Sequence, residues 1–173
     1  MSELFSSLSV QESSSDKIIS IGKLLKARAW HISCAESCTG GGLAYYFTSV
    51  AGSSEWFRQS WVTYSNEAKQ RLLGVTSQTL NQFGAVSEQT VKEMAAGCAQ
   101  NAQAHVGIAV SGIAGPGGGS VEKPVGTVWF GFWIAGETIQ LHRVFSGDRN
   151  AVRNQAIAFC IGYLHQWLVD HPH

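Results

Sequence analysis

The sequence lacks an excess of charge of either sign. Its 173 residues contain 12 lysines and arginines and 12 aspartates and glutamates, and runs of like charge are absent. A protein that binds nucleic acid or an anionic membrane through its overall charge is normally basic. We therefore expect no nucleic-acid partner and no membrane partner. Any anion that binds must be held by a local group of side chains or backbone N–H groups.

Long apolar runs and paired cysteine motifs are also missing. No segment approaches the roughly 20 apolar residues that a membrane-spanning helix needs, and the N-terminus lacks the pattern of a signal peptide. The four cysteines form no C-x-x-C motif and no zinc-type pairing with histidine. We interpret them as reduced, mostly core residues of a cytoplasmic protein, and we expect no metal and no redox cofactor. They are Cys34, Cys38, Cys98 and Cys160.

Two common nucleotide-binding signatures are absent from the glycine-rich segment 111–120. No Lys-Ser or Lys-Thr follows it, as a P-loop requires, and G-x-G-x-x-G fits in no register. Glycines nevertheless allow backbone N–H groups to converge on an anion. A single phosphate or carboxylate is therefore a candidate ligand, with Lys123 and Arg149 as nearby cations. The alternative is a flexible connecting loop.

The remaining composition, 45% hydrophobic and 14% charged, predicts one compact domain with a buried core. Strand patterns alternate with helical patterns, which predicts a single three-layer α/β/α domain with a mixed β-sheet over residues 16–173. Residues 1–15 are polar and rich in serine, and we expect a disordered tail there. Strands are predicted over 29–34, 60–64, 105–111, 125–134 and 138–145. Helices are predicted from 16 and 43, over 55–59, 66–73, 77–83 and 88–102, and after 148.

The segment 35–42 joins the first predicted strand to the next helix. Small hydroxyl residues followed by glycines bend the chain, cap the helix and expose backbone N–H groups. A serine at such a turn is well placed to act as a nucleophile, because the N–H groups can hold an oxyanion. Ser37 is the candidate nucleophile, and Cys38, Thr39 and Gly40 are candidate substrate contacts. There are two alternatives: the segment only caps the helix, or Cys38 is the nucleophile.

Lys69 is the candidate base for this serine. Burial can lower the pKa of a lysine toward neutrality, and Ser–Lys pairs are a known variant of serine catalysis. Tyr64 ends the strand before the Lys69 helix, and its hydroxyl could relay a proton or hold the lysine. The alternatives are a solvated helix lysine and a half-buried strand tyrosine.

Six motifs, in order, resemble those of the CinA C-terminal domain family. The resemblance covers about residues 16–170, and no departure occurs at Ser37, Tyr64 or Lys69. Longer family members carry an additional N-terminal domain, so this chain looks like the stand-alone form. The motifs are AESCTGG (35–41), VTYSNEAK (62–69), FGAVS (83–87), SGIAGP (111–116), EKPVGTV (122–128) and FSGDR (145–149).

The enzymatic members of this family are nicotinamide mononucleotide amidohydrolases. The resemblance therefore implies deamidation of nicotinamide mononucleotide to nicotinic acid mononucleotide and ammonia, in the salvage of NAD. It implies Ser37 as the nucleophile, Lys69 as the general base and Tyr64 as an assisting residue. It also implies a homodimer or a higher homo-oligomer.

Further residues are predicted to contact the mononucleotide. Trp61 and Phe83 are candidates for stacking on the pyridine ring. Two other functions stay open: a non-catalytic interaction protein linked to competence or DNA damage, and an amidase for a different small amide. The remaining candidate substrate-binding residues are Ser111, Gly112, Gly115, Gly117, Gly118 and Arg149.

Overall fold

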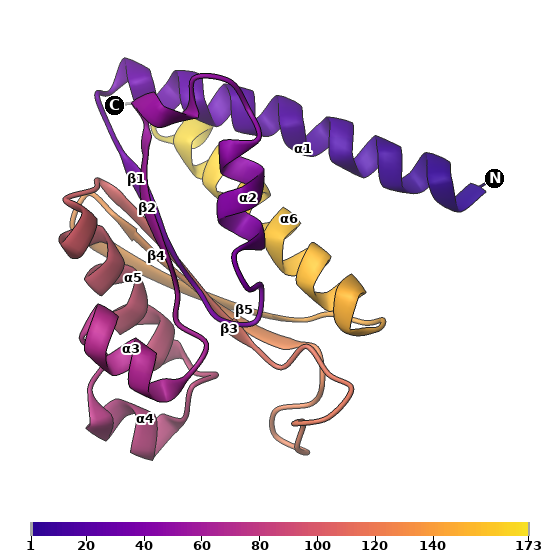
Figure 1. Cartoon of the computed structure of the whole chain (residues 1–173), viewed down its shortest axis with the longest axis vertical. Helices are drawn as coiled ribbons and strands as arrows, with labels where there is room; N and C mark the ends of the chain where they lie inside the picture. Colours follow the sequence, from indigo (N-terminus) through magenta and orange to yellow (C-terminus); the bar gives the residue numbers. More distant parts are fainter. Residues whose placement is uncertain (1, 173) are drawn as a thin grey trace.

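A mixed five-stranded sheet forms the centre of the protein, in the order β2-β1-β3-β4-β5 (Figure 1). The structure is a computed structural model that describes residues 2–172, with side chains described from residue 14. Strand β1 (Ile32–Glu36) pairs in parallel with both β2 (Phe57–Val62) and β3 (Val106–Gly112). Strands β4 (Thr127–Ile134) and β5 (Glu137–Val144) form an antiparallel hairpin that pairs with β3 through β4.

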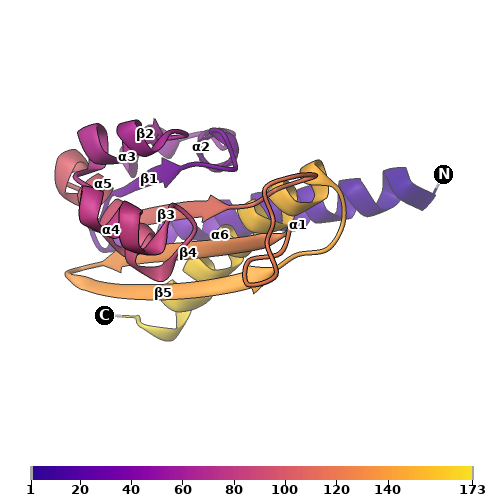
Figure 2. The same cartoon turned by 90° about the horizontal axis from the view of Figure 1, so that it is seen from below.

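Helices cover both faces of this sheet (Figures 1 and 2). One face carries α1 (Ser2–Ala27), α2 (Gly42–Thr48) and α6 (Arg149–Asp170), and α1 packs on α6. The other carries α3 (Asn66–Leu73), α4 (Ser77–Phe83) and α5 (Glu88–Ala102). A short 3-10 helix, η1 (Ser53–Glu55), precedes β2. The predicted three-layer α/β/α architecture with a mixed sheet is confirmed.

Two hydrophobic clusters fill the spaces between the sheet and its helices. Successive strand residues point to opposite faces, so Cys34 packs in the cluster under α1, α2 and α6. Its neighbour Ala35 packs in the cluster under α3, α4 and α5. Strand β1 is buried at every position because both of its faces are covered.

Two strand predictions were displaced. Strand β1 begins at Ile32 and extends to Glu36, instead of covering 29–34; helix α1 continues to Ala27, and Ala29 adopts a left-handed conformation beyond its end. Strand β2 covers Phe57–Val62, where a helix over 55–59 and a strand over 60–64 were predicted. An edge strand has one unpaired side and exposed polar residues, so it lacks the apolar pattern that marks a buried strand.

The first helix also bears on the predicted tail. Its backbone is helical from residue 2, so it includes most of the segment for which disorder was predicted. The side chains of residues 1–13 lie outside the described part of the chain, and the boundary at residue 15 stays a prediction. Among residues 2–172, no helix is long and apolar enough to cross a membrane.

Candidate active site

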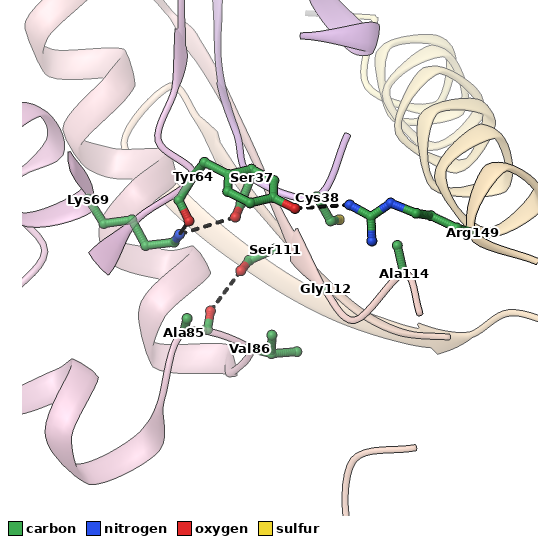
Figure 3. A pocket seen from close by; sticks show the side chains of 10 residues that line it. All are labelled: Ser37, Cys38, Tyr64, Lys69, Ala85, Val86, Ser111, Gly112, Ala114 and Arg149. Atoms are coloured by element: carbon green, nitrogen blue, oxygen red, sulfur yellow. Dashed lines mark hydrogen bonds between the residues drawn. The ribbon is translucent and has the colours of Figure 1, made fainter. Parts of the chain in front are cut away.

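A cavity of about 210 Å³ lies where β1, β2 and β3 end (Figure 3). Parallel strands of open α/β sheets build their sites at these carboxyl ends. The cavity brings together segments that are more than a hundred residues apart in the sequence. Its walls are formed by Ser37, Cys38, Tyr64, Lys69, Ala85, Val86, Ser111, Gly112, Ala114 and Arg149.

Ser37 is the first residue after β1. Its N–H donates to the carbonyl of Val110 at 2.9 Å, which continues the β1–β3 pairing by one more hydrogen bond. The side chain is 8% exposed and lines the cavity. The candidate nucleophile is therefore held at a fixed point at the end of β1, an interior strand of the sheet.

Glu36 fixes the turn that follows, a role that the sequence reasoning missed. Its buried carboxylate accepts hydrogen bonds from the N–H groups of Leu43 and Ala44, each at 2.9 Å, at the start of α2. It also accepts from the Thr39 hydroxyl at 2.5 Å. These three donors replace the water that would solvate the buried carboxylate, and no cation among the described side chains lies within ion-pair distance of it. The Thr39 side chain therefore supports the turn and is not part of the cavity wall.

Helix α3 carries Lys69 into the cavity. Ser65 begins the helix by accepting a hydrogen bond from the Ala68 N–H at 3.0 Å, and Gly74 ends it, which agrees with the helix predicted over 66–73. Lys69 and Leu73, four residues apart, share the buried face of the helix. The Lys69 side chain is only 1% exposed, and no carboxylate among the described residues lies within ion-pair distance of it.

The Lys69 amine has three oxygen neighbours. Its Nζ lies 2.7 Å from the Thr63 carbonyl. It also lies 3.4 Å from the Tyr64 carbonyl and 3.1 Å from the Ser37 hydroxyl (Figure 3). A neutral amine has two N–H bonds and one lone pair. The two carbonyls can accept only from the N–H bonds, so the lone pair is directed to the Ser37 hydroxyl. In this protonation state the geometry is that of a base facing a nucleophile.

Burial lowers the pKa of Lys69 from its usual 10.5 to about 8. A substantial fraction of the lysine is therefore neutral near physiological pH. Burial has the opposite effect on an acid, and it raises the pKa of Cys38 to about 11. The Cys38 thiol therefore stays protonated at pH values where the Lys69 amine is already neutral, which favours Ser37 over Cys38 as the candidate nucleophile.

The backbone of the turn has N–H groups available for an oxyanion. Within the described chain, the N–H groups of Cys38 and Thr39 have no hydrogen-bond acceptor. The N–H of Gly40 is occupied, because it donates to the Ser37 carbonyl at 3.1 Å. The Gly40 N–H, predicted as a substrate contact, therefore stabilises the turn and is not available to a ligand.

Arg153 holds the other side of this turn, and the sequence reasoning also missed it. It lies in α6, and its Nε and Nη2 donate to the carbonyls of Cys38 and Thr39 at 3.1 and 3.2 Å. A trans peptide directs its C=O and N–H in opposite directions, so fixing the Cys38 carbonyl also fixes the Thr39 N–H. Its position four residues after Arg149, on the same face of α6, was the available signal.

Tyr64 and Arg149 meet across the mouth of the cavity. Arg149 Nη2 donates to the Tyr64 hydroxyl at 2.9 Å (Figure 3). Its Nη1 donates to the Gly115 carbonyl at 2.8 Å. The Tyr64 hydroxyl is therefore engaged with Arg149, and the part of Tyr64 that contacts Lys69 is its carbonyl. Arg149 connects the strand β2 side of the site to the glycine-rich loop.

The other predicted contacts divide into two groups. Ser111 and Gly112 line the cavity, and the Ser111 hydroxyl donates to the Ala85 carbonyl at 2.8 Å. The glycine-rich loop contributes Ala114, whereas Gly115, Gly117 and Gly118 are not among the lining residues. The proposed stacking residues Trp61 and Phe83 do not line the cavity either.

Two features bear on metals and redox chemistry. All four cysteines are free and buried. Among the side chains of the described residues, no group of three or more histidine, cysteine, aspartate or glutamate residues is arranged to hold a metal ion.

Comparison with known proteins gives consistent matches over most of the chain. A model of the CinA C-terminal domain matches residues 15–168, which include every residue of the cavity. The nicotinamide-nucleotide amidohydrolase PncC of Enterobacter agglomerans is 58% identical over 144 residues, which are 83% of this chain and 88% of that protein. The protein of the same name from Escherichia coli strain K12 is 55% identical over 147 residues, which are 84% and 89%.

A solved structure agrees with the fold. The crystal structure of a CinA superfamily protein from Klebsiella pneumoniae 700603 has a TM-score of 0.87 and 38% sequence identity. It covers 91% of this chain and 98% of its own.

Proposed function

Because the chain belongs to the CinA C-terminal domain family, we propose that it hydrolyses the carboxamide of nicotinamide mononucleotide. The products are nicotinic acid mononucleotide and ammonia, which makes the reaction a step in the salvage of NAD. The names of the two amidohydrolase relatives support the substrate. The chemistry rests on one observation, the buried Lys69 amine 3.1 Å from the Ser37 hydroxyl inside the cavity.

The reaction begins with neutral Lys69. Its lone pair takes the proton of the Ser37 hydroxyl while the serine oxygen attacks the carboxamide carbon. The carbonyl oxygen becomes an oxyanion, which accepts hydrogen bonds from the N–H groups of Cys38 and Thr39. The Lys69 ammonium then returns its proton to the amide nitrogen, the C–N bond breaks and ammonia leaves.

Water completes the cycle. Lys69, neutral again, takes a proton from a water molecule that attacks the acyl-enzyme carbonyl. The second tetrahedral intermediate then collapses as the Lys69 ammonium gives this proton to the leaving Ser37 oxygen, which releases the carboxylic acid and restores the serine hydroxyl and the neutral lysine. Tyr64 assists by position in this scheme. Its carbonyl accepts from the lysine amine, and its hydroxyl holds Arg149 at the cavity mouth.

The test is ammonia release from nicotinamide mononucleotide by the purified protein. Ser37→Ala and Lys69→Ala should each reduce kcat at least about a hundredfold, the scale of losing a nucleophile or a base. Ser54→Ala and Lys92→Ala, at exposed positions, are the matched controls and should behave as the wild type. Wild-type activity in Ser37→Ala would remove Ser37 from the mechanism.

The setting of the reaction completes the proposal. Four free buried cysteines suit a reducing compartment, and we propose that the protein works in the cytoplasm. We also propose that it works as a homodimer or a higher homo-oligomer, as the family resemblance implies. Light scattering tests this, and the mass of a single chain of 18.6 kDa would refute it.

A further inference from the structure

A second cavity adjoins the catalytic one. The catalytic cavity, at about 210 Å³, is smaller than the roughly 300–1,000 Å³ typical of sites for ligands of mononucleotide size. The second cavity has a volume of about 520 Å³ and shares Ala114 and Arg149 with the first. Its other walls are Pro116, Val125, Gly147, Asp148 and Asn150.

Arg149 is the cation common to both cavities. A guanidinium has five N–H donors, and two of them serve the Gly115 carbonyl and the Tyr64 hydroxyl. Three donors therefore remain for a ligand. Lys123, the other cation predicted near the loop, donates to the Phe83 carbonyl at 2.9 Å and lines neither cavity.

The second cavity otherwise offers apolar and uncharged polar walls. Ala114, Pro116 and Val125 present carbon atoms, and Asn150 carries an amide that can both donate and accept. Asp148 is the one acidic residue among them, and its carboxylate caps α6 by accepting from the Ala151 N–H at 2.8 Å. A dianion is therefore best accommodated at the Arg149 end of the cavity.

We propose that the second cavity binds the ribosyl phosphate half of the substrate while the pyridine carboxamide occupies the catalytic cavity. This inference rests on the proposed function and identifies the part of the molecule that makes a mononucleotide, rather than a free amide, the substrate. The ribose packs on Pro116 and Val125, the Asn150 amide faces its hydroxyl groups, and the phosphate accepts from the free donors of Arg149.

The test narrows the second cavity without touching the first. Asn150 is exposed in the first turn of α6, so Asn150→Trp places a large ring at the cavity wall without disturbing the core. Asn154→Trp is the matched control, since Asn154 is also exposed, lies one turn later in α6 and lines neither cavity. Asn150→Glu is a second variant of nearly native size that adds a negative charge.

Two measurements are made on each protein: the KM for nicotinamide mononucleotide, and the inhibition constant of ribose 5-phosphate against it. Asn150→Trp and Asn150→Glu should raise both constants by about tenfold or more, with little change in kcat, because they remove binding made outside the reacting centre. Asn154→Trp should leave both constants unchanged. Equal values for the Asn150 variants and the control would overturn the inference.

The same experiment separates this inference from the proposed function. If the wild type releases no ammonia from nicotinamide mononucleotide, the proposed function fails. Calorimetry with ribose 5-phosphate then decides the inference alone, because binding weakened by Asn150→Trp and Asn150→Glu but not by Asn154→Trp supports the subsite. Equal binding by the wild type and all three variants, or no binding by the wild type, rejects it.

Discussion

The pKa of Lys69 makes the pH dependence of the reaction a quantitative test of its role as a base. In the proposed mechanism the neutral amine is the active form, and burial lowers the pKa of Lys69 to about 8. At pH 7 about one tenth of the molecules carry neutral Lys69, and at pH 9 about nine tenths do. Because the neutral fraction rises with pH, kcat/KM should increase about tenfold between these values and level off above pH 9.

The assay is the initial rate of ammonia release at low substrate concentration and constant ionic strength, from pH 7 to 9.5. The substrate phosphate has its second pKa near 6, so its charge changes little in this range. Lys69→Arg is the matched variant, because it keeps a cation that cannot lose its proton. It should be at least about a hundredfold slower and show no rise with pH. A wild-type profile that is flat or falls between pH 7 and 9 would refute Lys69 as the base.

Four further predictions each concern a single residue. Cys38→Ala should reduce kcat less than about tenfold, because the thiol stays protonated at neutral pH. Ser37→Ala, measured in parallel by ammonia release, should reduce kcat at least about a hundredfold. Arg153→Ala should lower kcat about tenfold or more and change KM less than threefold, because it loosens the turn without touching the substrate cavities; equal effects on both constants would argue against this positioning role. Gly131→Ala should lower the free energy of unfolding by about 2 kcal/mol, since its Cβ would lie 2.2 Å from a backbone oxygen of α5. Gly162 lies inside α6, and a Cβ at this position would have no neighbour within 4 Å. Gly162→Ala should therefore raise the free energy of unfolding by about 0.5–1 kcal/mol, because alanine loses less conformational entropy than glycine in a helix. Urea unfolding of both variants measures the sign of each change.

Helix boundaries set by local chemistry were accessible from the sequence. Ser65, Ser87 and Asp148 each accept a backbone N–H bond at a helix start, as their residue types predicted. The prediction for strand β2 was displaced because the pairing of this strand with β1, rather than its own residues, decides where it begins. The polar Arg58 and Gln59 are exposed there, and no alternation of apolar residues marks the strand.

Residues of the site likewise fall into those that local motifs indicate and those that only the fold reveals. That Ser37 and Lys69 would lie in one site could be proposed because each sits in a recognisable local motif, although their separation of 3.1 Å arises only from the fold. Glu36 and Arg153 were missed because their partners are backbone N–H and carbonyl groups, whose direction no residue type reveals. The carbonyl partners of Arg153 are also more than a hundred residues away in the sequence, so only the packing of α6 on the sheet creates the contact.

The position of α6 has a consequence for how the protein could be divided and reassembled. The β4–β5 turn at Ala135 and Gly136 is exposed, and it separates Ser37 and Lys69 on one side of the chain from Arg149 and Arg153 on the other. A chain cut at this turn would leave each fragment with only part of the site. Recovery of ammonia release on mixing the two fragments would therefore report the docking of α6 onto the sheet, and the protein's own turnover would serve as the sensor of its assembly.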